Sequence, residues 1–188
     1  MKAPTIRDTT RSFYQSHSRE YASATVVRAL AEALRDFCQR LPSDGRVLDL
    51  GCGAGHDLSS ISETGRVAIG LDYAEPIARI ARSSSSCPVV VSDIRCIPFG
   101  DIVFDGVWAS ASLLHLPRRD LPVALSEIRR VLRPKGYFFA SVKAGTGEMF
   151  DKDGRFFALY EQDDWRYSLQ QAGFGMLSLD YNESTAPN

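Results

Sequence analysis

Short apolar runs alternate with helical stretches through the middle of this chain, and that alternation limits the fold more than any other feature. The runs cover residues 46–50, 66–71, 89–92, 105–109 and 137–143 and are apolar along nearly their whole length. Strands of a parallel sheet that is covered on both faces have this composition, because neither face meets water. We therefore predict an α/β domain built on a doubly wound, mostly parallel sheet.

Helical periodicity separates these runs. From Thr25 to Leu41 the apolar residues recur at the i, i+3, i+4 spacing of one buried helical face, and Pro42 ends the pattern. Later helices are predicted over residues 54–63, 76–82, 121–132 and 163–172. A last strand is predicted over residues 174–181, after a short aromatic segment at 155–160.

The length of 188 residues is enough for one domain, and no repeat or linker divides it. We expect a single domain over residues 1–188 with three parts. Residues 1–45 form an N-terminal lid and helix, residues 46–143 form the ligand-binding core, and residues 144–188 form a C-terminal region on the substrate side.

Charge and composition exclude several classes of protein. A net charge of −1 gives no overall attraction to nucleic acid or to an anionic membrane. The longest apolar stretches fall far short of the roughly 20 residues that span a bilayer, and the polar start has no signal-peptide core. Four cysteines without paired spacing and three separated histidines predict no disulfide framework and no metal site. We expect a cytoplasmic protein.

The first predicted strand runs into a glycine-rich turn, VLDLGCGAG at residues 47–55, and a helix follows directly. Glycines there allow a ligand to approach the backbone closely, although a tight turn alone also favours glycine. The charge of Asp49 discriminates between two kinds of ligand. A dinucleotide pyrophosphate would be repelled by this carboxylate, whereas the sulfonium and ammonium groups of S-adenosylmethionine would be attracted. Alternatively, Asp49 only accepts hydrogen bonds from loop amides.

Acidic residues also end the next two strands. Asp72 lies 21 residues after Gly51, near the spacing at which an acid accepts hydrogen bonds from ribose hydroxyls in nucleoside-binding folds. Tyr73 follows and offers a ring to an adenine face. Asp93 and Ile94 end the third strand, where they could bind the adenine amino group and cover the base. One such aspartate is usually a turn or cap residue, but three at successive strand ends favour a ligand site.

Five segments in order resemble the successive motifs of class I S-adenosylmethionine-dependent methyltransferases. They are VLDLGCGAGHD, GLDYAEPIARIAR, SDIRCIPF, FDGVWASASLLHLP and LRPKGYFFASVK, which together cover about residues 46–143. The resemblance implies a Rossmann-like fold and S-adenosylmethionine as cofactor, with S-adenosylhomocysteine as product. It assigns the cofactor to Asp49, Gly51, Cys52, Gly53, Asp72, Tyr73, Asp93, Ile94, Ala109 and Ser110, with Ala109 below the sulfonium.

The N-terminal segment resembles the lid that many small members of this family place over the cofactor. Tyr14 and Tyr21 lie seven residues apart, on one face if the segment is a single helix. We assign Tyr21 to the cofactor and Tyr14 to the substrate; both could instead only pack the lid onto the domain. His17, also in the lid, is a weaker substrate candidate.

His115 is the best-placed candidate for a general base, because it follows the fourth strand and an imidazole titrates near neutral pH. The alternative is that it only packs or caps the next helix. Lys143 ends the fifth strand and could orient an acidic substrate, although a lysine there is commonly just solvated. The basic cluster around residues 118–135 is interleaved with acids, so nucleic acid is not the expected partner.

The chain departs from the family pattern at its end. The family's sheet has seven strands, and no sequence remains for the seventh after a strand at 174–181. Another copy of the chain could supply the missing pairing, giving a homodimer through the exposed sheet edge. The leading hypothesis is a methyltransferase acting on a small molecule. Alternatives are an inactive S-adenosylmethionine-binding regulatory protein and, less favoured, an NAD-dependent oxidoreductase.

Overall fold

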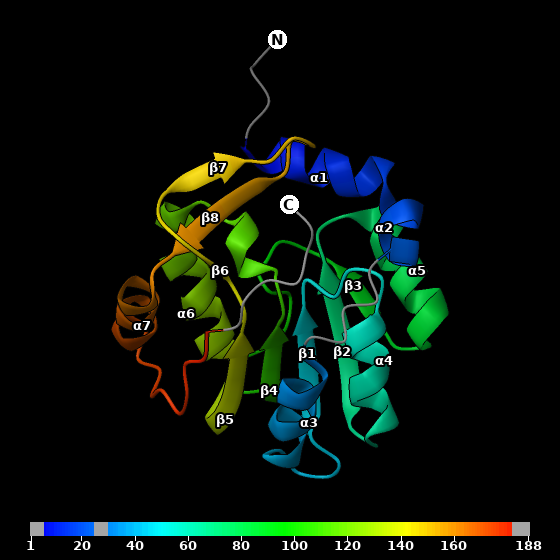
Figure 1. The fold of residues 1–188 in the computed structure, drawn as a ribbon. Coiled ribbons are helices and arrows are strands. Elements are labelled where there is room, and N and C mark those ends of the chain that lie inside the picture. The colour runs from blue at the N-terminus through cyan, green and yellow to red at the C-terminus, as the bar shows by residue number, and fades with distance from the viewer. Residues whose placement is uncertain (1–5, 25–29, 182–188) are drawn as a thin grey trace.

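The centre of the molecule is a five-stranded parallel sheet in the order β3-β2-β1-β4-β5 (Figure 1). The computed structural model describes residues 6–24 and 30–181. The strands are β1 (Arg46–Leu50), β2 (Val67–Asp72), β3 (Val89–Val91), β4 (Phe104–Ala109) and β5 (Leu132–Ala140). The strand order reverses at β1, and the ligand crevice of doubly wound folds opens at such a point.

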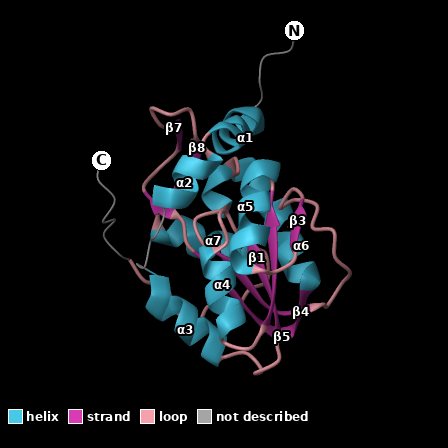
Figure 2. Cartoon of the chain, turned by 90° about the vertical axis from the view of Figure 1, so that its right-hand side faces the viewer, coloured by secondary structure: helices cyan, strands magenta, loops and turns pink. Residues whose placement is uncertain are grey.

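Helices cover both faces of this sheet (Figures 1 and 2). Successive residues of β1 show why, because Val47 and Leu48 are both fully buried yet belong to two separate cores. The core with Val47 is closed by α3 (Ala31–Gln39), α4 (His56–Glu63) and α5 (Glu75–Ser85). The core with Leu48 is closed by α6 (Leu121–Val131) and α7 (Gln162–Gln171). The predicted doubly wound α/β fold is confirmed.

A second layer lies over the carboxyl ends of the parallel strands. It consists of α1 (Ile6–Ser16), α2 (Ser18–Ala24) and a small sheet in the order β6-β8-β7 (Figure 1). The strands of this sheet are β6 (Lys143–Ala144), β7 (Glu148–Phe150) and β8 (Phe156–Tyr160). Two single turns of 3₁₀ helix, η2 (Leu113–His115) and η3 (Arg118–Asp120), connect β4 to α6. We call α1, α2 and the small sheet the lid.

The prediction of a last strand over residues 174–181 is wrong. The segment has no regular structure. Its first residue is held by both backbone and side chain, since the Phe174 amide donates to the Leu169 carbonyl oxygen at 3.0 Å and the ring packs on Phe138 of β5 at 5.0 Å between centroids. The aromatic segment at 155–160 forms β8 instead, outside the central sheet. Within residues 6–24 and 30–181, β5 therefore pairs only with β4. The central sheet thus lacks two of the family's seven strands there, where the sequence indicated one.

Two further expectations about the N-terminal region need adjustment. Tyr14 and Tyr21 do not share one helix, because the chain bends at His17 between α1 and α2. The helix predicted over 25–41 is present from Ala31, and residues 25–29 lie outside the described part. No helix in the described ranges is long and apolar enough to cross a bilayer.

Candidate active site

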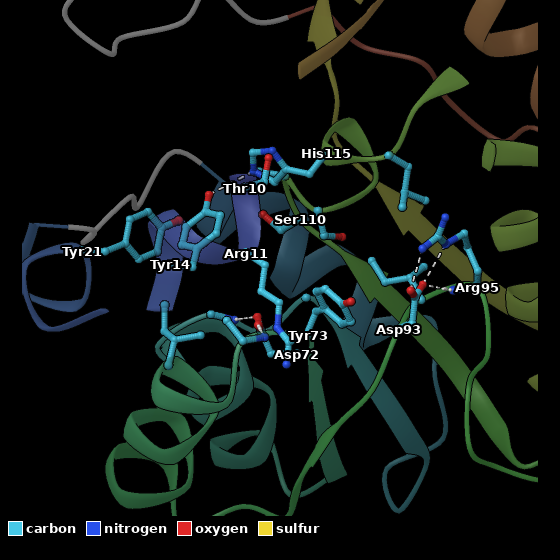
Figure 3. Close-up of a pocket in the computed structure, with 18 residues that line it drawn as sticks. Thr10, Arg11, Tyr14, Tyr21, Asp72, Tyr73, Asp93, Arg95, Ser110 and His115 are labelled. Atoms are coloured by element: carbon cyan, nitrogen blue, oxygen red, sulfur yellow. Dashed lines mark hydrogen bonds and ion pairs between the residues drawn. The ribbon is translucent and has the colours of Figure 1, made fainter. Parts of the chain in front are cut away.

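A pocket lies where the strand ends meet the lid (Figure 3). Its floor comes from the turns after β1, β2 and β4 and from the segment after β3, and its cover comes from α1, α2 and η2. Its lining includes ten of the fifteen site residues predicted from sequence: Tyr14, Tyr21, Gly51, Gly53, Asp72, Tyr73, Asp93, Ile94, Ser110 and His115. Distant segments therefore converge as the motif order implied.

The glycine turn is tied to the neighbouring strand by its own backbone. The amides of Gly51 and Cys52 both donate to the Leu71 carbonyl oxygen, at 2.7 and 3.0 Å. Gly51 has φ +81, and a Cβ placed on it would lie 2.3 Å from the Cβ of Ser112. Glycine is thus required at position 51 for both conformation and space. Gly51 and Gly53 both line the pocket, and having no side chains they offer it only backbone atoms.

Asp49 is a buried acid, and no cation of the described residues acts on it. Its side chain is 2% exposed, and Oδ2 has no hydrogen-bond partner among the described residues. Burial raises the pKa of this carboxyl well above 3.8, and the nearby Asp57 and Asp72 raise it further. Asp49 itself is not among the residues that line the pocket and lies behind the glycine turn. A buried negative charge is costly unless it is neutralised, so its field favours a positively charged ligand on the other side of that turn.

Asp72 is oriented by two backbone amides at the end of β2. The Gly53 amide donates to Oδ2 at 3.0 Å, and the Ala74 amide donates to Oδ1 at 2.9 Å. Burial raises the pKa of Asp72 to about 6, although these hydrogen bonds act in the opposite direction. Each carboxylate oxygen retains a lone pair, so both can accept from neighbouring hydroxyls of one ligand.

Arginines contact two of the residues that the sequence assigned to adenine, the aromatic Tyr73 and the acidic Asp93. The Arg11 guanidinium lies 4.6 Å from the centroid of the Tyr73 ring, and Arg11 lines the pocket. Arg95 pairs with Asp93 through two contacts, Nη2 to Oδ2 at 2.6 Å and Nε to Oδ1 at 2.9 Å. Arg95 also pairs with Asp120, which fixes the guanidinium and through it the Asp93 carboxylate.

Two predicted cofactor residues turn their side chains into the core. Cys52 is 8% exposed and packs against Gly70, and burial raises the pKa of its thiol. Ala109 is fully buried in the core closed by α6. Neither lines the pocket, so only their backbones are available to a ligand there. The next residue, Ser110, does line it, as do Ala111 and Ser112.

The lid places Tyr14 and His115 against each other at the upper side of the pocket (Figure 3). The Tyr14 hydroxyl lies 3.0 Å from His115 Nε2, and His115 Nδ1 lies 2.7 Å from the carbonyl oxygen of Phe156 in β8. Tyr21 packs edge-on against Tyr14 at 5.1 Å between centroids. Burial lowers the pKa of His115 to about 4 and raises that of Tyr14 above its usual range.

The other two predicted substrate residues do not line this pocket. His17 is exposed, stacks on Phe13 at 4.7 Å between centroids, and contacts the Phe13 carbonyl oxygen through Nδ1. Lys143 is exposed and holds Nζ 4.2 Å from the centroid of the Phe157 ring. Phe157 in turn packs on His115 at 4.8 Å, so Lys143 stays close to the histidine end of the site.

Several lining residues were missed by sequence reasoning, above all Thr10, Arg11, Arg95 and Ser112. The first two carried a usable signal. Thr10 and Arg11 stand four and three residues before Tyr14, so a helix puts all three on one face. Arg95 and Ser112 lacked such a signal, since each is placed by packing between segments that are distant in sequence.

The comparisons with known proteins agree with this geometry. Residues 48–140 match the family model described as a methyltransferase domain. A sterol 4-C-methyltransferase of Caenorhabditis elegans is 33% identical over 115 residues, which cover 57% of this chain and 34% of that protein. The mitochondrial arginine-hydroxylase NDUFAF5 of Danio rerio is 28% identical over an alignment of 193 residues, covering 94% of this chain and 59% of that protein.

A crystal structure of Burkholderia thailandensis 1,6-didemethyltoxoflavin-N1-methyltransferase, with 1,6-didemethyltoxoflavin and S-adenosylhomocysteine bound, superposes with a TM-score of 0.73. It is 24% identical and covers 95% of this chain and 82% of its own. The chain spans 34–59% of the length of the first curated relatives that it matches. With the unpaired buried Asp49 and the glycine cradle fitting a sulfonium cofactor, the chain belongs to the class I S-adenosylmethionine-dependent methyltransferases.

Proposed function

We propose that this chain transfers the methyl group of S-adenosylmethionine to a small-molecule acceptor in the cytoplasm. The observation that carries the proposal is the buried Asp49 carboxylate, whose Oδ2 has no partner within the described residues and which lies at the glycine turn. A cationic cofactor would satisfy this charge, whereas the pyrophosphate of NAD would be repelled by it.

The strand-end residues would hold the cofactor along the pocket. Gly51 and Gly53, with Asp49 behind them, would take the methionine end. Asp72 would accept from the ribose hydroxyls with two oxygens that the Gly53 and Ala74 amides already orient. Asp93 and Ile94 would bind adenine. The cofactor supplies a methyl group activated by a sulfonium leaving group.

The chain's own contribution to transfer is alignment and exclusion of water. Tyr14 and Tyr21 of the lid cover the pocket with their rings packed edge to face, and the Phe156 carbonyl oxygen of the lid contacts His115 Nδ1. The pocket is covered by α1, α2 and η2 and stays partly open to solvent, and a partly covered pocket of this kind supports a small molecule as acceptor. The sterol and didemethyltoxoflavin methyltransferases named above, by their names, modify small molecules.

Two features of the assembly remain part of this proposal. We propose that residues 1–188 act as one domain with the three parts predicted from sequence. We also propose that the outer edge of β5, which pairs only with β4 among the described residues, serves a homodimer. Sedimentation of the purified chain tests the second point, since a monomer at all concentrations would contradict it.

The central test separates binding from turnover. Calorimetry with S-adenosylmethionine, S-adenosylhomocysteine and NAD is expected to show binding of the first two only. Incubation with methyl-labelled cofactor and fractionated metabolite extracts is expected to yield a labelled small molecule. Binding without any labelled product would favour an inactive cofactor-binding protein, and tight NAD binding alone would favour an oxidoreductase.

A matched pair of variants controls this test. Asp72→Ala removes the carboxylate at the end of β2 and is expected to lower cofactor affinity at least tenfold. Asp101→Ala removes an acid whose side chain is 70% exposed and pairs with Arg130 away from the pocket. It is expected to leave affinity unchanged. Equal affinities of the two variants would contradict the assigned role of Asp72.

A further inference from the structure

We propose that Tyr14 takes the proton from the acceptor and passes its own to His115, so that the acceptor is a hydroxyl or amine compound. The inference rests on the proposed methyl transfer and goes beyond it by naming the acceptor's chemical class. It is carried by a chain of hydrogen bonds from α1 through His115 to β8.

The tautomer of His115 follows from its partners. A carbonyl oxygen can only accept, so the contact of 2.7 Å to the Phe156 oxygen puts the proton of the imidazole on Nδ1. The neutral ring then has its lone pair on Nε2. Tyr14 lies 3.0 Å from Nε2 and must donate its hydroxyl proton there. Both hydrogen-bonding positions of the imidazole are therefore occupied from inside the protein.

This arrangement changes which group meets the acceptor. Nε2 is covered by the Tyr14 hydroxyl, so an acceptor in the pocket does not reach the imidazole lone pair directly. While it donates to Nε2, the Tyr14 oxygen accepts a hydrogen bond from the Arg155 guanidinium with one lone pair and keeps the other, and Tyr14 lines the pocket. The group offered to a proton on the acceptor is thus the tyrosine oxygen, with the histidine behind it.

The proton and electron pairs balance in one step. The nucleophilic oxygen or nitrogen of the acceptor forms a bond to the methyl carbon, and the carbon–sulfur bond breaks with its electron pair staying on sulfur. The acceptor's proton moves to the Tyr14 oxygen as the Tyr14 proton moves to Nε2. His115 becomes an imidazolium that still donates from Nδ1 to Phe156, and it later releases the added proton to water.

The charged groups around the pair shape this transfer. Arg155 and Lys143 disfavour a positive imidazole, while Asp151 favours it. For Tyr14, burial, Tyr21 and Asp72 disfavour a negative oxygen, while Arg155 favours it. Tyr14 therefore does not hold a charge in the resting site, and transfer through it must be concerted. A pKa of about 4 keeps His115 neutral throughout the range pH 5–8, so that Nε2 carries the lone pair to which Tyr14 donates.

The resting hydrogen bonds can be tested without knowing the acceptor. Long-range ¹H–¹⁵N spectra of protein labelled with [¹⁵N]histidine are expected to show His115 protonated on Nδ1 and unprotonated on Nε2 at pH 7. Tyr14→Phe should keep this tautomer but move the Nε2 shift toward that of a free imine. Protonation on Nε2, or an unmoved shift in the variant, would overturn the relay.

The transfer itself is tested on acceptors of defined chemistry. A panel of hydroxyl, primary amine, tertiary amine and thioether compounds is incubated with methyl-labelled S-adenosylmethionine. We expect products only from hydroxyls or amines that carry a proton. Tyr14→Phe should lower kcat at least tenfold with little change in KM or cofactor affinity, and it should reduce the solvent deuterium isotope effect. Tyr167→Phe, which removes a hydroxyl from an exposed tyrosine on α7, is the control.

The outcomes separate the relay from the function on which it rests. If labelled product forms mainly from tertiary amines or thioethers, or if Tyr14→Phe retains kcat, the relay is overturned and methyl transfer stands. If the cofactor fails to bind, or binds without labelling any acceptor in the panel or in metabolite extracts, the proposed function falls and the relay falls with it.

Discussion

The two ends of the pocket are built in different ways. At the cofactor end, backbone amides do most of the positioning: Gly51 and Cys52 donate to Leu71, and the Gly53 amide donates to Asp72 across 19 residues of sequence. At the lid end, side chains do it over much longer separations. Tyr14 and His115 are 101 residues apart, and Thr10 and Phe156 are 146 residues apart.

This difference predicts different tolerance to change. A site positioned by backbone hydrogen bonds depends on residues that can adopt the backbone conformation of the turn. Most other side chains near it can be replaced. A site made from side-chain pairs is lost when either partner is removed, while the fold beneath it survives. The cofactor end is therefore sensitive to backbone conformation and buried charge, and the lid end to single hydrogen-bonding groups.

The largest effect is expected from Gly51→Ala. The added Cβ would lie 2.3 Å from the Ser112 Cβ at a residue with φ +81, so strain and overlap act together. We expect loss of cofactor binding in calorimetry and a decrease in unfolding free energy of about 2 to 5 kcal/mol.

Gly154→Ala is the matched control for backbone strain. Gly154 has φ +78, nearly that of Gly51, but a Cβ there would meet nothing within 4 Å. It should cost about 1 to 2 kcal/mol from conformation alone and leave cofactor affinity intact. Equal losses in the two variants would show that crowding against Ser112 contributes nothing.

Asp49→Asn should raise stability while it weakens binding. The raised pKa of Asp49 means that its stabilising contribution is present below pH 3.8 and is lost as pH rises through the raised value. The neutral amide avoids this loss, so the variant should be more stable than the parent at pH 8, by roughly 1 to 3 kcal/mol. Its affinity for S-adenosylmethionine should fall at least tenfold.

Urea unfolding from pH 5 to pH 8 measures this effect. The stability difference between variant and parent should grow with pH. Asp101→Asn, at an acid whose side chain is 70% exposed, should show no such trend. If the stabilities of parent and Asn variant changed with pH at the same rate, the prediction would be contradicted. The charge of Asp49 would then be compensated inside the fold.

The same contrast explains what could be predicted from the sequence. The cofactor end was foreseen because strand, turn and acid follow each other within a few residues, so that Asp49, Asp72 and Asp93 each mark a strand end. Parallel pairing brings those ends together without further information. The sheet, its helices and the position of the pocket follow from the same local signals.

The lid end could not be predicted in the same way. Nothing near Tyr14 in sequence indicates that its partner is His115 or that Phe156 orients that histidine. Residues 174–181 show the complementary error, since their apolar pattern suits a strand but a strand needs a ladder partner. There the Phe174 ring packs on Phe138 instead, and the backbone stays irregular.

Thr10→Val tests the lid end with a smaller effect. Thr10 is 8% exposed, and its hydroxyl oxygen accepts from the Phe156 amide at 2.9 Å. Valine keeps the shape and leaves that amide without a partner, at a cost of about 1 to 3 kcal/mol. We expect faster hydrogen exchange at Phe156 and a changed His115 ¹⁵N shift.

The effect of Thr10→Val on cofactor affinity shows whether the lid end and the cofactor end of the pocket are independent. Cofactor affinity should stay within about threefold of the parent, because the backbone hydrogen bonds of the glycine turn within residues 6–24 and 30–181 do not involve α1. Thr10→Ser retains the accepting oxygen and should restore slow exchange at Phe156. An affinity loss as large as that of Asp49→Asn would show that the two ends of the pocket are not independent.

The smallest effect is expected from Cys52→Ala, although Cys52 lies inside the glycine turn. Its thiol packs against Gly70 in the core, so the change should cost about 1 kcal/mol of stability and alter cofactor affinity less than twofold. Cys38→Ala removes another thiol buried in the same core but away from the turn, and it should behave alike.

Alkylation gives an independent check that the Cys52 thiol is buried in the core. Iodoacetamide should modify the exposed Cys96 readily and Cys52 slowly, because burial raises the pKa of the Cys52 thiol and the reactive thiolate is scarce. If Cys52→Ala weakened cofactor binding tenfold while Cys38→Ala did not, a side chain of the turn would contact the ligand. The glycine turn would then bind the cofactor through a side chain as well as through its backbone.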